Sequence, residues 1–150
     1  MKIELRFIRN KSIVSDLIQW QTFGKWSHVE VCLQNGYLGS QAPDGVKLRP
    51  LDYCKPAEEF RCVVEVTCSQ HDKIMDFLNA QIGKPYDYRS ILGFVIRRDW
   101  ADPDTWFCSE LVAAAFLHAG VPLLRTDEVN RISPSTLALS PHLQGISSIC

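Results

Sequence analysis

A cysteine at the start of an apolar helical run is the feature that most constrains this sequence. The run is Trp106–Phe116, in which Cys108 is followed by Ser109 and Glu110 and then by aliphatic and aromatic residues. A helix N-terminus carries partial positive charge and free backbone N–H groups, which lower the pKa of a thiol and can hold a developing oxyanion. The sequence therefore predicts a reactive thiol at Cys108, with a buried core cysteine as the alternative.

A base for this thiol lies in a segment typical of a β-strand. Residues 26–33 alternate polar and apolar side chains around two valines, and His28 lies near the start of this segment. Because residues two apart on a strand share a face, Glu30 is expected beside His28. A neighbouring carboxylate would raise the pKa of the histidine and favour a thiolate–imidazolium pair. The alternatives are a core histidine with satisfied hydrogen bonds and a Glu30 that points to solvent.

Composition limits the other classes of protein that this chain could represent. The chain has 150 residues, of which 46% are hydrophobic and 22% are charged, so we expect one domain spanning residues 1–150. A net charge of -1 gives no global electrostatic reason to bind nucleic acid. Residues 1–10 alternate charged and apolar side chains, unlike a signal peptide, and no apolar run approaches the ~20 residues that span a bilayer. We therefore expect a cytoplasmic protein without stable membrane insertion.

The six cysteines are predicted to be free thiols, because the chain has no secretion signal and has ample residues for a core. No C-x-x-C pair occurs and the four histidines lack ligand spacing, so we expect neither a metal nor another cofactor. Cys32 and Cys62 lie in apolar strand-like segments, where a cysteine usually packs as a small hydrophobe.

Hydrophobic periodicity predicts mixed α and β elements. Strands are expected at residues 1–10, 26–33, 37–41, 45–50 and 60–67, and helices at 12–23, 69–82 and 108–119. Asn35 and Gly36 are typical of the turn that closes a tight hairpin, here between the second and third strands.

Capping residues and prolines predict where several elements begin and end. Ser69 and Asp72 have the spacing of a capping box for the middle helix, and residues 102–104 offer caps for the cysteine helix. A turn at 83–88 leads into an apolar run at 91–96. Three prolines and many serines between residues 121 and 150 predict an irregular surface tail.

Four blocks in this order resemble the circularly permuted form of the papain-like NlpC/P60 superfamily, of the YaeF/YiiX type. The blocks are Ser27–Val31, Gly45–Leu51, Gly83–Tyr88 and Trp106–Val112, and together they cover about residues 26 to 118. In the permuted family the histidine strand precedes the cysteine helix, as it does here. The resemblance implies an α+β fold in permuted order, with an antiparallel half-barrel sheet packed against the cysteine helix, Cys108 as nucleophile and His28 as base.

The resemblance also implies a third residue that orients the histidine ring, often a carboxylate or another polar residue on the following strand. Ser40 falls at the expected place, but a serine cannot stabilise an imidazolium by charge, so Ser40, Gln41 and Glu30 are all candidates. Tyr86 matches a tyrosine of the family that lies near the cysteine, and it is a candidate for substrate binding, with core packing as the alternative. Gln41 and Trp106 are the other candidates for substrate contact.

Three functions follow from these residues. The first is a thiol hydrolase of amide or peptide bonds, for which the resemblance implies bacterial cell-wall peptides as substrates; the missing signal peptide would suit a phage-encoded or otherwise delivered protein. The second is an acyltransferase or thioesterase-type lipid-handling enzyme, which an apolar tunnel beside Cys108 would favour. The third is a non-catalytic binding or phage structural module, which a buried Cys108 far from His28 would favour. The expected partner is a peptide, amide or acyl substrate.

Overall fold

A computed structural model of the chain describes residues 1–22, 24–89, 104–125 and 132–146. Its strands are β1 (Lys2–Arg9), β2 (His28–Leu33), β3 (Gly36–Gln41), β4 (Gly45–Arg49), β5 (Glu58–Glu65) and β6 (Gln144–Gly145). Its helices are α1 (Ile13–Thr22), α2 (Cys68–Gln81), α4 (Cys108–His118) and α5 (Pro134–Leu137). The expected α+β class is confirmed, and each expected strand and helix is present with its ends moved by a few residues. The apolar run at 91–96 lies outside the described residues.

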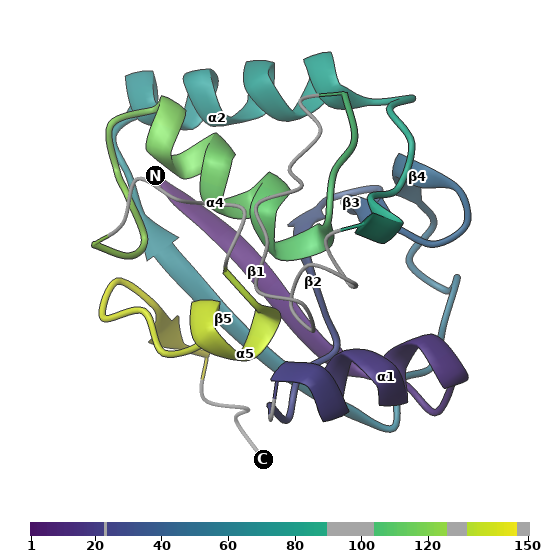
Figure 1. Cartoon of the computed structure of the whole chain (residues 1–150). Helices are drawn as coiled ribbons and strands as arrows, with labels where there is room; N and C mark the ends of the chain where they lie inside the picture. Colours follow the sequence, from purple (N-terminus) through teal and green to yellow (C-terminus); the bar gives the residue numbers. More distant parts are fainter. Residues whose placement is uncertain (23, 90–103, 126–131, 147–150) are drawn as a thin grey trace.

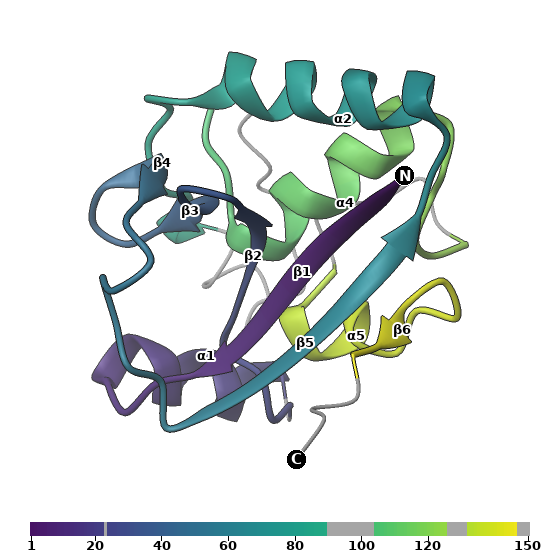
Figure 2. The ribbon, with the colours of Figure 1, turned by 180° about the vertical axis from the view of Figure 1, so that it is seen from behind.

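The strands form one six-stranded antiparallel sheet in the order β4-β3-β2-β1-β5-β6. β1 lies in the middle and pairs with β2 on one side and β5 on the other (Figure 2). Apolar side chains of these strands, such as Leu5, Val31 and Cys62, lie directly opposite one another and are buried. The charged residues that alternate with them therefore share the other face of the sheet.

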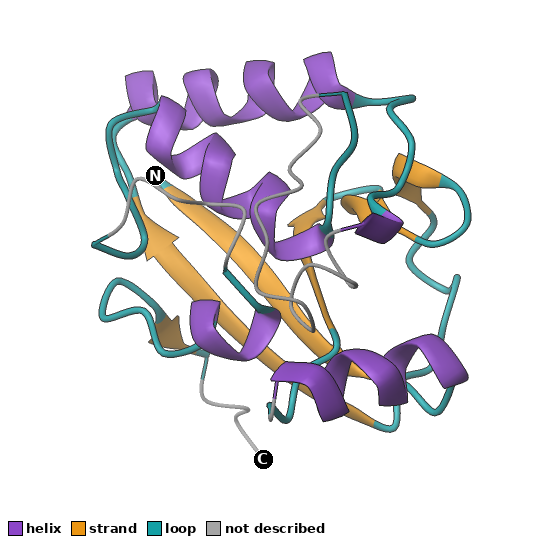
Figure 3. Ribbon diagram, viewed as in Figure 1, coloured by secondary structure: helices purple, strands orange, loops and turns teal. Residues whose placement is uncertain are grey.

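The helix that carries Cys108 packs across the apolar side of the sheet. α4 lies in front of β1 and β2, and α2 lies beyond it (Figures 1 and 3). Leu111, Val112 and Phe116 of α4 are fully buried in one core with Leu5 and Phe7 of β1. Each such side chain contributes about 1.5–3 kcal/mol by leaving water, so this packing fixes the position of the helix start. None of the described helices is long and apolar enough to cross a lipid bilayer.

Both expected helix caps are wrong, because other residues cap α2 and α4. α2 begins at Cys68, so Thr67 is its N-cap and forms a capping box with Gln70 rather than Ser69 with Asp72. α4 begins at Cys108 itself, and the Glu110 carboxylate accepts a hydrogen bond from the Phe107 N–H at 3.3 Å. Asp104 is four residues from the helix start and is not its cap, and residues 102–103 lie outside the described part.

The turn after β2 is displaced by one residue from the expected position. Leu33 pairs with Gly36, so Gln34 and Asn35 form the turn and Gly36 belongs to β3. Gly36 is needed for close packing, because a Cβ atom there would lie 2.2 Å from the backbone oxygen of Arg49 on β4.

The expected irregular tail is found over most of its described residues, but two short elements interrupt it, and Ile132 and Leu137 are buried rather than on the surface. Ser133 caps α5, and Pro134 occupies the first turn, where the missing N–H of proline costs no hydrogen bond. Gln144 and Gly145 add the edge strand β6 to β5. The Ser135 hydroxyl accepts a hydrogen bond from the Trp26 N–H at 2.8 Å, so the tail holds the segment that leads into His28.

Candidate active site

The two residues of the predicted dyad are brought together by the ends of two elements. His28 is the first residue of β2, and Cys108 is the first residue of α4. Their side chains interact, since Cys108 is among the groups that raise the pKa of His28. His28 is 6% exposed and Cys108 is 0% exposed, so the contact is shielded from water. The thiol lies at a helix N-terminus, where free backbone N–H groups are available to a negatively charged oxygen or sulfur atom.

Glu30 lies on the other side of the histidine ring and is fully buried. One carboxylate oxygen, Oε2, lies 3.2 Å from Nε2 of His28 and accepts a hydrogen bond from the Tyr53 hydroxyl at 2.8 Å. The second oxygen, Oε1, lies 3.1 Å from Nη1 of Arg6. Because Nε2 is paired with Glu30, Nδ1 is the ring nitrogen available to Cys108. The arrangement is a buried chain of thiol, imidazole and carboxylate.

This arrangement favours the charged forms of both the histidine and the carboxylate. Burial lowers the pKa of His28, but the hydrogen bonds and negative charges of Cys108 and Glu30 outweigh burial and raise the pKa from 6.5 to about 9. Burial raises the pKa of Glu30, but His28, Tyr53 and Arg6 outweigh it and hold this pKa below the usual value. At neutral pH this raised pKa favours the protonated form of His28, next to Cys108.

Cross-strand pairing supplies the charges behind Glu30. Arg6 on β1 lies opposite Glu30 on β2 and opposite Arg61 on β5. Arg6 is 3% exposed, and its Nε lies 2.6 Å from Glu59, which Arg61 contacts at 2.8 Å. Arg61 also lies 3.1 Å from Glu4. Positive and negative side chains thus alternate from the exposed edge of this face to the buried Glu30.

Ser40 does not contact the histidine. Its hydroxyl donates a hydrogen bond to the backbone carbonyl of Trp106, and the residue is fully buried. The register of β2 and β3, which pairs Val31 with Leu38, places Ser40 opposite Val29 when it is continued by two residues. Ser40 therefore lies on the face away from His28 and holds the segment before Cys108.

Trp106 was expected to bind substrate, but its side chain points toward α2. The indole Nε1 donates a hydrogen bond to Gln81 at 3.1 Å, and the ring packs edge-on against Phe77 with 5.9 Å between centroids. Trp106 is therefore part of the contact between α2 and the segment before α4.

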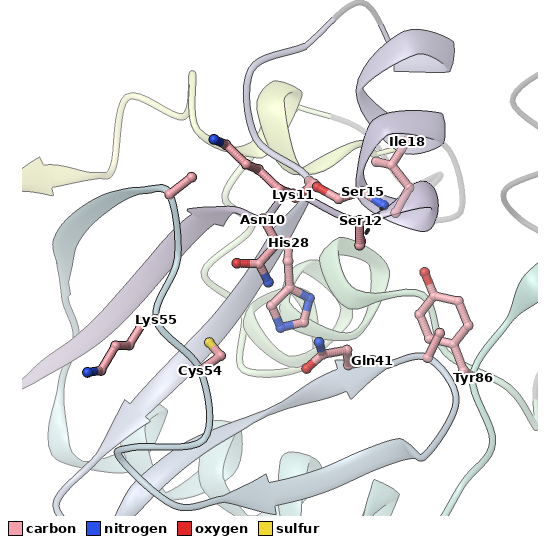
Figure 4. Close-up of a pocket in the computed structure, with 13 residues that line it drawn as sticks. Asn10, Lys11, Ser12, Ser15, Ile18, His28, Gln41, Cys54, Lys55 and Tyr86 are labelled. Atoms are coloured by element: carbon pink, nitrogen blue, oxygen red, sulfur yellow. Dashed lines mark hydrogen bonds between the residues drawn. The ribbon is translucent and has the colours of Figure 1, made fainter.

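A cavity of about 760 Å³ opens beside His28 (Figure 4). Two predicted substrate contacts, Gln41 and Tyr86, line it, whereas Cys108 is fully buried. The Gln41 side-chain oxygen is buried without a hydrogen-bond partner among the described residues, and Tyr86 packs against Phe107 with 5.9 Å between centroids. The remaining lining residues are Asn10, Lys11, Ser12, Ser15, Ile18, Ser27, Ala42, Cys54, Lys55 and Ala57.

Sequence reasoning missed two residues that hold Glu30. Arg6 could have been predicted from the sequence. A strand that alternates polar and apolar residues and has a charge at its centre needs an opposite charge on the neighbouring strand. Tyr53 follows β4 in a segment without regular periodicity, and no local pattern marks it.

The five cysteines of the described part are free thiols, and Cys150 lies outside that part. Cys62 is buried, as expected for a small hydrophobe, and Cys32 is partly buried.

Comparisons with known proteins give one informative result. No protein-family model matches this chain, and no curated protein matches its sequence. Among solved structures, it is similar to the crystal structure of the metalloprotein YiiX from Escherichia coli O157:H7, with a TM-score of 0.72. The identity is 20%, and the similarity covers 96% of this chain and 94% of YiiX. This chain therefore has a YiiX-like α+β fold.

Proposed function

We propose that this protein is a cysteine hydrolase that cleaves an amide bond, with the strands and helix in the permuted papain-like arrangement. The observation that carries the proposal is the buried chain of Cys108, His28 and Glu30 at the start of α4. Each member has the neighbour that its role requires: a base for the thiol, and a carboxylate that orients and charges the base. The YiiX-like fold supports the proposal at the level of architecture.

The reaction follows from these positions. The Cys108 thiolate attacks the amide carbonyl, forming a C–S bond, and backbone N–H groups at the start of α4 stabilise the oxyanion. The His28 imidazolium gives its proton to the leaving nitrogen as the C–N bond breaks, which leaves a thioester on Cys108. His28 then takes a proton from water, the water oxygen attacks the thioester, and the C–S bond breaks. Glu30 holds the ring and stabilises its charge in both steps.

The metal in the name of YiiX is not carried over to this chain. Within the described residues, no three His, Cys, Asp or Glu side chains are grouped so that they could hold a metal ion. The proposed mechanism uses protein side chains and water alone.

The cavity favours an amide substrate over an acyl chain. Among its lining side chains in the described part of the chain, the aliphatic ones are the short or single residues Ile18, Ala42 and Ala57, and most of the others end in polar groups. An acyl-chain tunnel would need long aliphatic walls. Full burial of Cys108 is the one observation that favours a non-catalytic module, and the following experiment decides between the two.

The test is the rate of iodoacetamide alkylation against pH, followed by peptide mapping in the native protein and in His28→Ala. We expect Cys108 to react ahead of the exposed Cys68 at neutral pH and to lose this advantage in His28→Ala. The matched control is His71→Ala on α2, whose histidine lies 3.4 Å from Asp72 but outside the site. Equal alkylation rates for Cys108 and Cys68 in the native protein would refute the proposed enzymatic function. The non-catalytic binding module would then be the remaining function.

If Cys108 proves reactive, hydrolysis assays follow with cell-wall peptides as amide substrates and acyl esters as the comparison. Preference for the esters would move the proposal toward lipid or acyl-transfer chemistry.

A further inference from the structure

Two lysines from different segments border the cavity beside His28. Lys11 precedes α1, and Lys55 lies in the segment between β4 and β5. Both are exposed, and neither forms an ion pair with any described residue. Figure 4 shows both on the same side of His28, with Tyr86 on the opposite side. Their charges are therefore available to a ligand on that side of the ring.

The cavity carries no compensating negative charge within the described part of the chain. No Asp or Glu is among its lining residues, although acidic residues outnumber basic ones by 17 to 16 in the whole sequence. α1 begins at Ile13, next to lining residues 10–12, so the positive end of its dipole adds to the same field. A positive cleft in a chain of net charge -1 is a local feature and not a consequence of composition.

Polar groups continue from the lysines to the histidine. Asn10, Ser12, Ser15 and Ser27 line the same cavity. The side-chain oxygen of Gln41 is buried there, and no residue in the described part of the chain is its hydrogen-bond partner, whereas buried polar atoms normally have one. A ligand N–H group next to His28 would supply that partner, as the N–H of a substrate amide does.

We infer that the cleft binds substrates that carry an anionic group, a carboxylate or a phosphate, on the Lys11 and Lys55 side of the scissile amide. The inference rests on the proposed function, because it assigns the substrate class of that site. It predicts that a neutral amide of the same size is a poorer ligand than its anionic counterpart, and that the difference disappears at high salt.

Iodoacetate and iodoacetamide provide a matched pair of probes. Both alkylate a thiolate with loss of iodide, and they differ in a carboxylate against a neutral amide. The measured quantity is the ratio of the iodoacetate rate to the iodoacetamide rate at Cys108. We expect this ratio to fall about twofold in Lys11→Ala and in Lys55→Ala and about fourfold in the double variant, as for charges acting through water. In about 0.5 M sodium chloride the native ratio is expected to fall to that of the double variant.

Lys73→Ala is the control, since Lys73 is exposed on α2 and does not line the cavity. A ratio that is unchanged in the double variant would overturn the inference, while fast alkylation by iodoacetamide would still support the proposed function. If Cys108 reacts with neither reagent, the proposed function fails. Anion binding in the cleft is then tested separately by thermal unfolding.

In the thermal measurement, the native protein and the double variant are compared in phosphate, succinate and chloride at equal ionic strength. A higher Tm of the native protein in phosphate or succinate, absent from the double variant, supports anion binding and shows which anion is preferred. Equal changes of Tm in the native protein and in the double variant would overturn the inference of anion binding.

Discussion

Replacing Glu30 by glutamine tests the link between the carboxylate and the histidine. Glu30→Gln keeps the size of the side chain and can still accept a hydrogen bond from Nε2 of His28, but it removes the negative charge 3.2 Å away. The rise of the His28 pKa from 6.5 to about 9 corresponds to about 3 kcal/mol in favour of the imidazolium. Cys108 and Glu30 share this effect. If Glu30 supplies somewhat less than half, its charge is worth about 1.4 kcal/mol, and the variant should titrate about one pH unit lower.

The assay is an NMR titration of the histidine side chains, with the His28 signal identified by its loss in His28→Asn. His71, His118 and His142 serve as internal references. Glu59→Gln is the matched control, because Glu59 also pairs with Arg6 but does not contact His28. Arg6 keeps one of its two acidic partners in either variant. The same His28 midpoint in the native protein and in Glu30→Gln would refute electrostatic coupling and, with it, the assignment of Glu30 as the third residue.

The same pKa shift predicts how stability depends on pH. The pKa of His28 is higher in the folded protein than in the unfolded chain, so its contribution is fully present below about pH 6.5 and is lost as the pH rises through about 9. Urea unfolding should therefore give a free energy that falls by about 3 kcal/mol over this window from this group. In Glu30→Gln the decrease in the free energy of unfolding over this pH window should be smaller by about 1 kcal/mol. An unchanged decrease would contradict electrostatic coupling between Glu30 and His28.

Three further substitutions separate positioning from packing. Tyr53→Phe removes the 2.8 Å hydrogen bond to the carboxylate, and the expected result is a loss of about 1 kcal/mol in urea unfolding with a lower His28 pKa by NMR; no change in either would refute the role of the hydroxyl. Ser40→Ala removes the bond to the Trp106 carbonyl, so stability should fall by about 1–2 kcal/mol while the pH profile of Cys108 alkylation stays unchanged, and a shifted profile would restore Ser40 to the site. Gly45→Ala places a Cβ atom 2.2 Å from a backbone oxygen at a φ of 77°, whereas Gly83→Ala, at a φ of 94°, meets no atom within 4 Å. Urea unfolding should show a larger loss for the first, by at least about 1 kcal/mol, and equal losses would contradict the contact.

The sequence alone could have distinguished Ser40 from Glu30 as the residue that lies beside His28. In a hairpin with a two-residue turn, an even-numbered residue on β2 lies opposite an odd-numbered residue on β3, whichever two residues form the turn. His28 and Glu30 therefore share a face with Gln41 and Gly39, and Ser40 is excluded. The structure agrees, because a Cβ atom at Gly39 would lie 3.1 Å from that of Glu30. Placing the turn one residue too late changes the partners but not the face.

Other features depend on contacts that no local pattern encodes. Tyr53 reaches Glu30 from a segment between strands, and the cap of α4 comes from Glu110 within the helix. The position of Cys108 against His28 requires α4 to be packed on the sheet, which depends on side chains throughout the core. Cys108 and His28 could be named as a candidate pair from residue type and order, whereas the distance between them could not be predicted.

The ionic face of the sheet supports a functional role for Glu30. A buried ion pair contributes little net stability, because removing two charges from water costs several kcal/mol per ion, and apolar residues of similar volume usually serve a fold as well. Arg6 and Glu30 nevertheless occupy opposed central positions on β1 and β2, where the other face of the same strands is packed with aliphatic side chains. Stability alone does not account for this pair. A charged carboxylate held by Arg6 and Tyr53 does what an apolar residue cannot, because it keeps His28 protonated beside Cys108 at neutral pH.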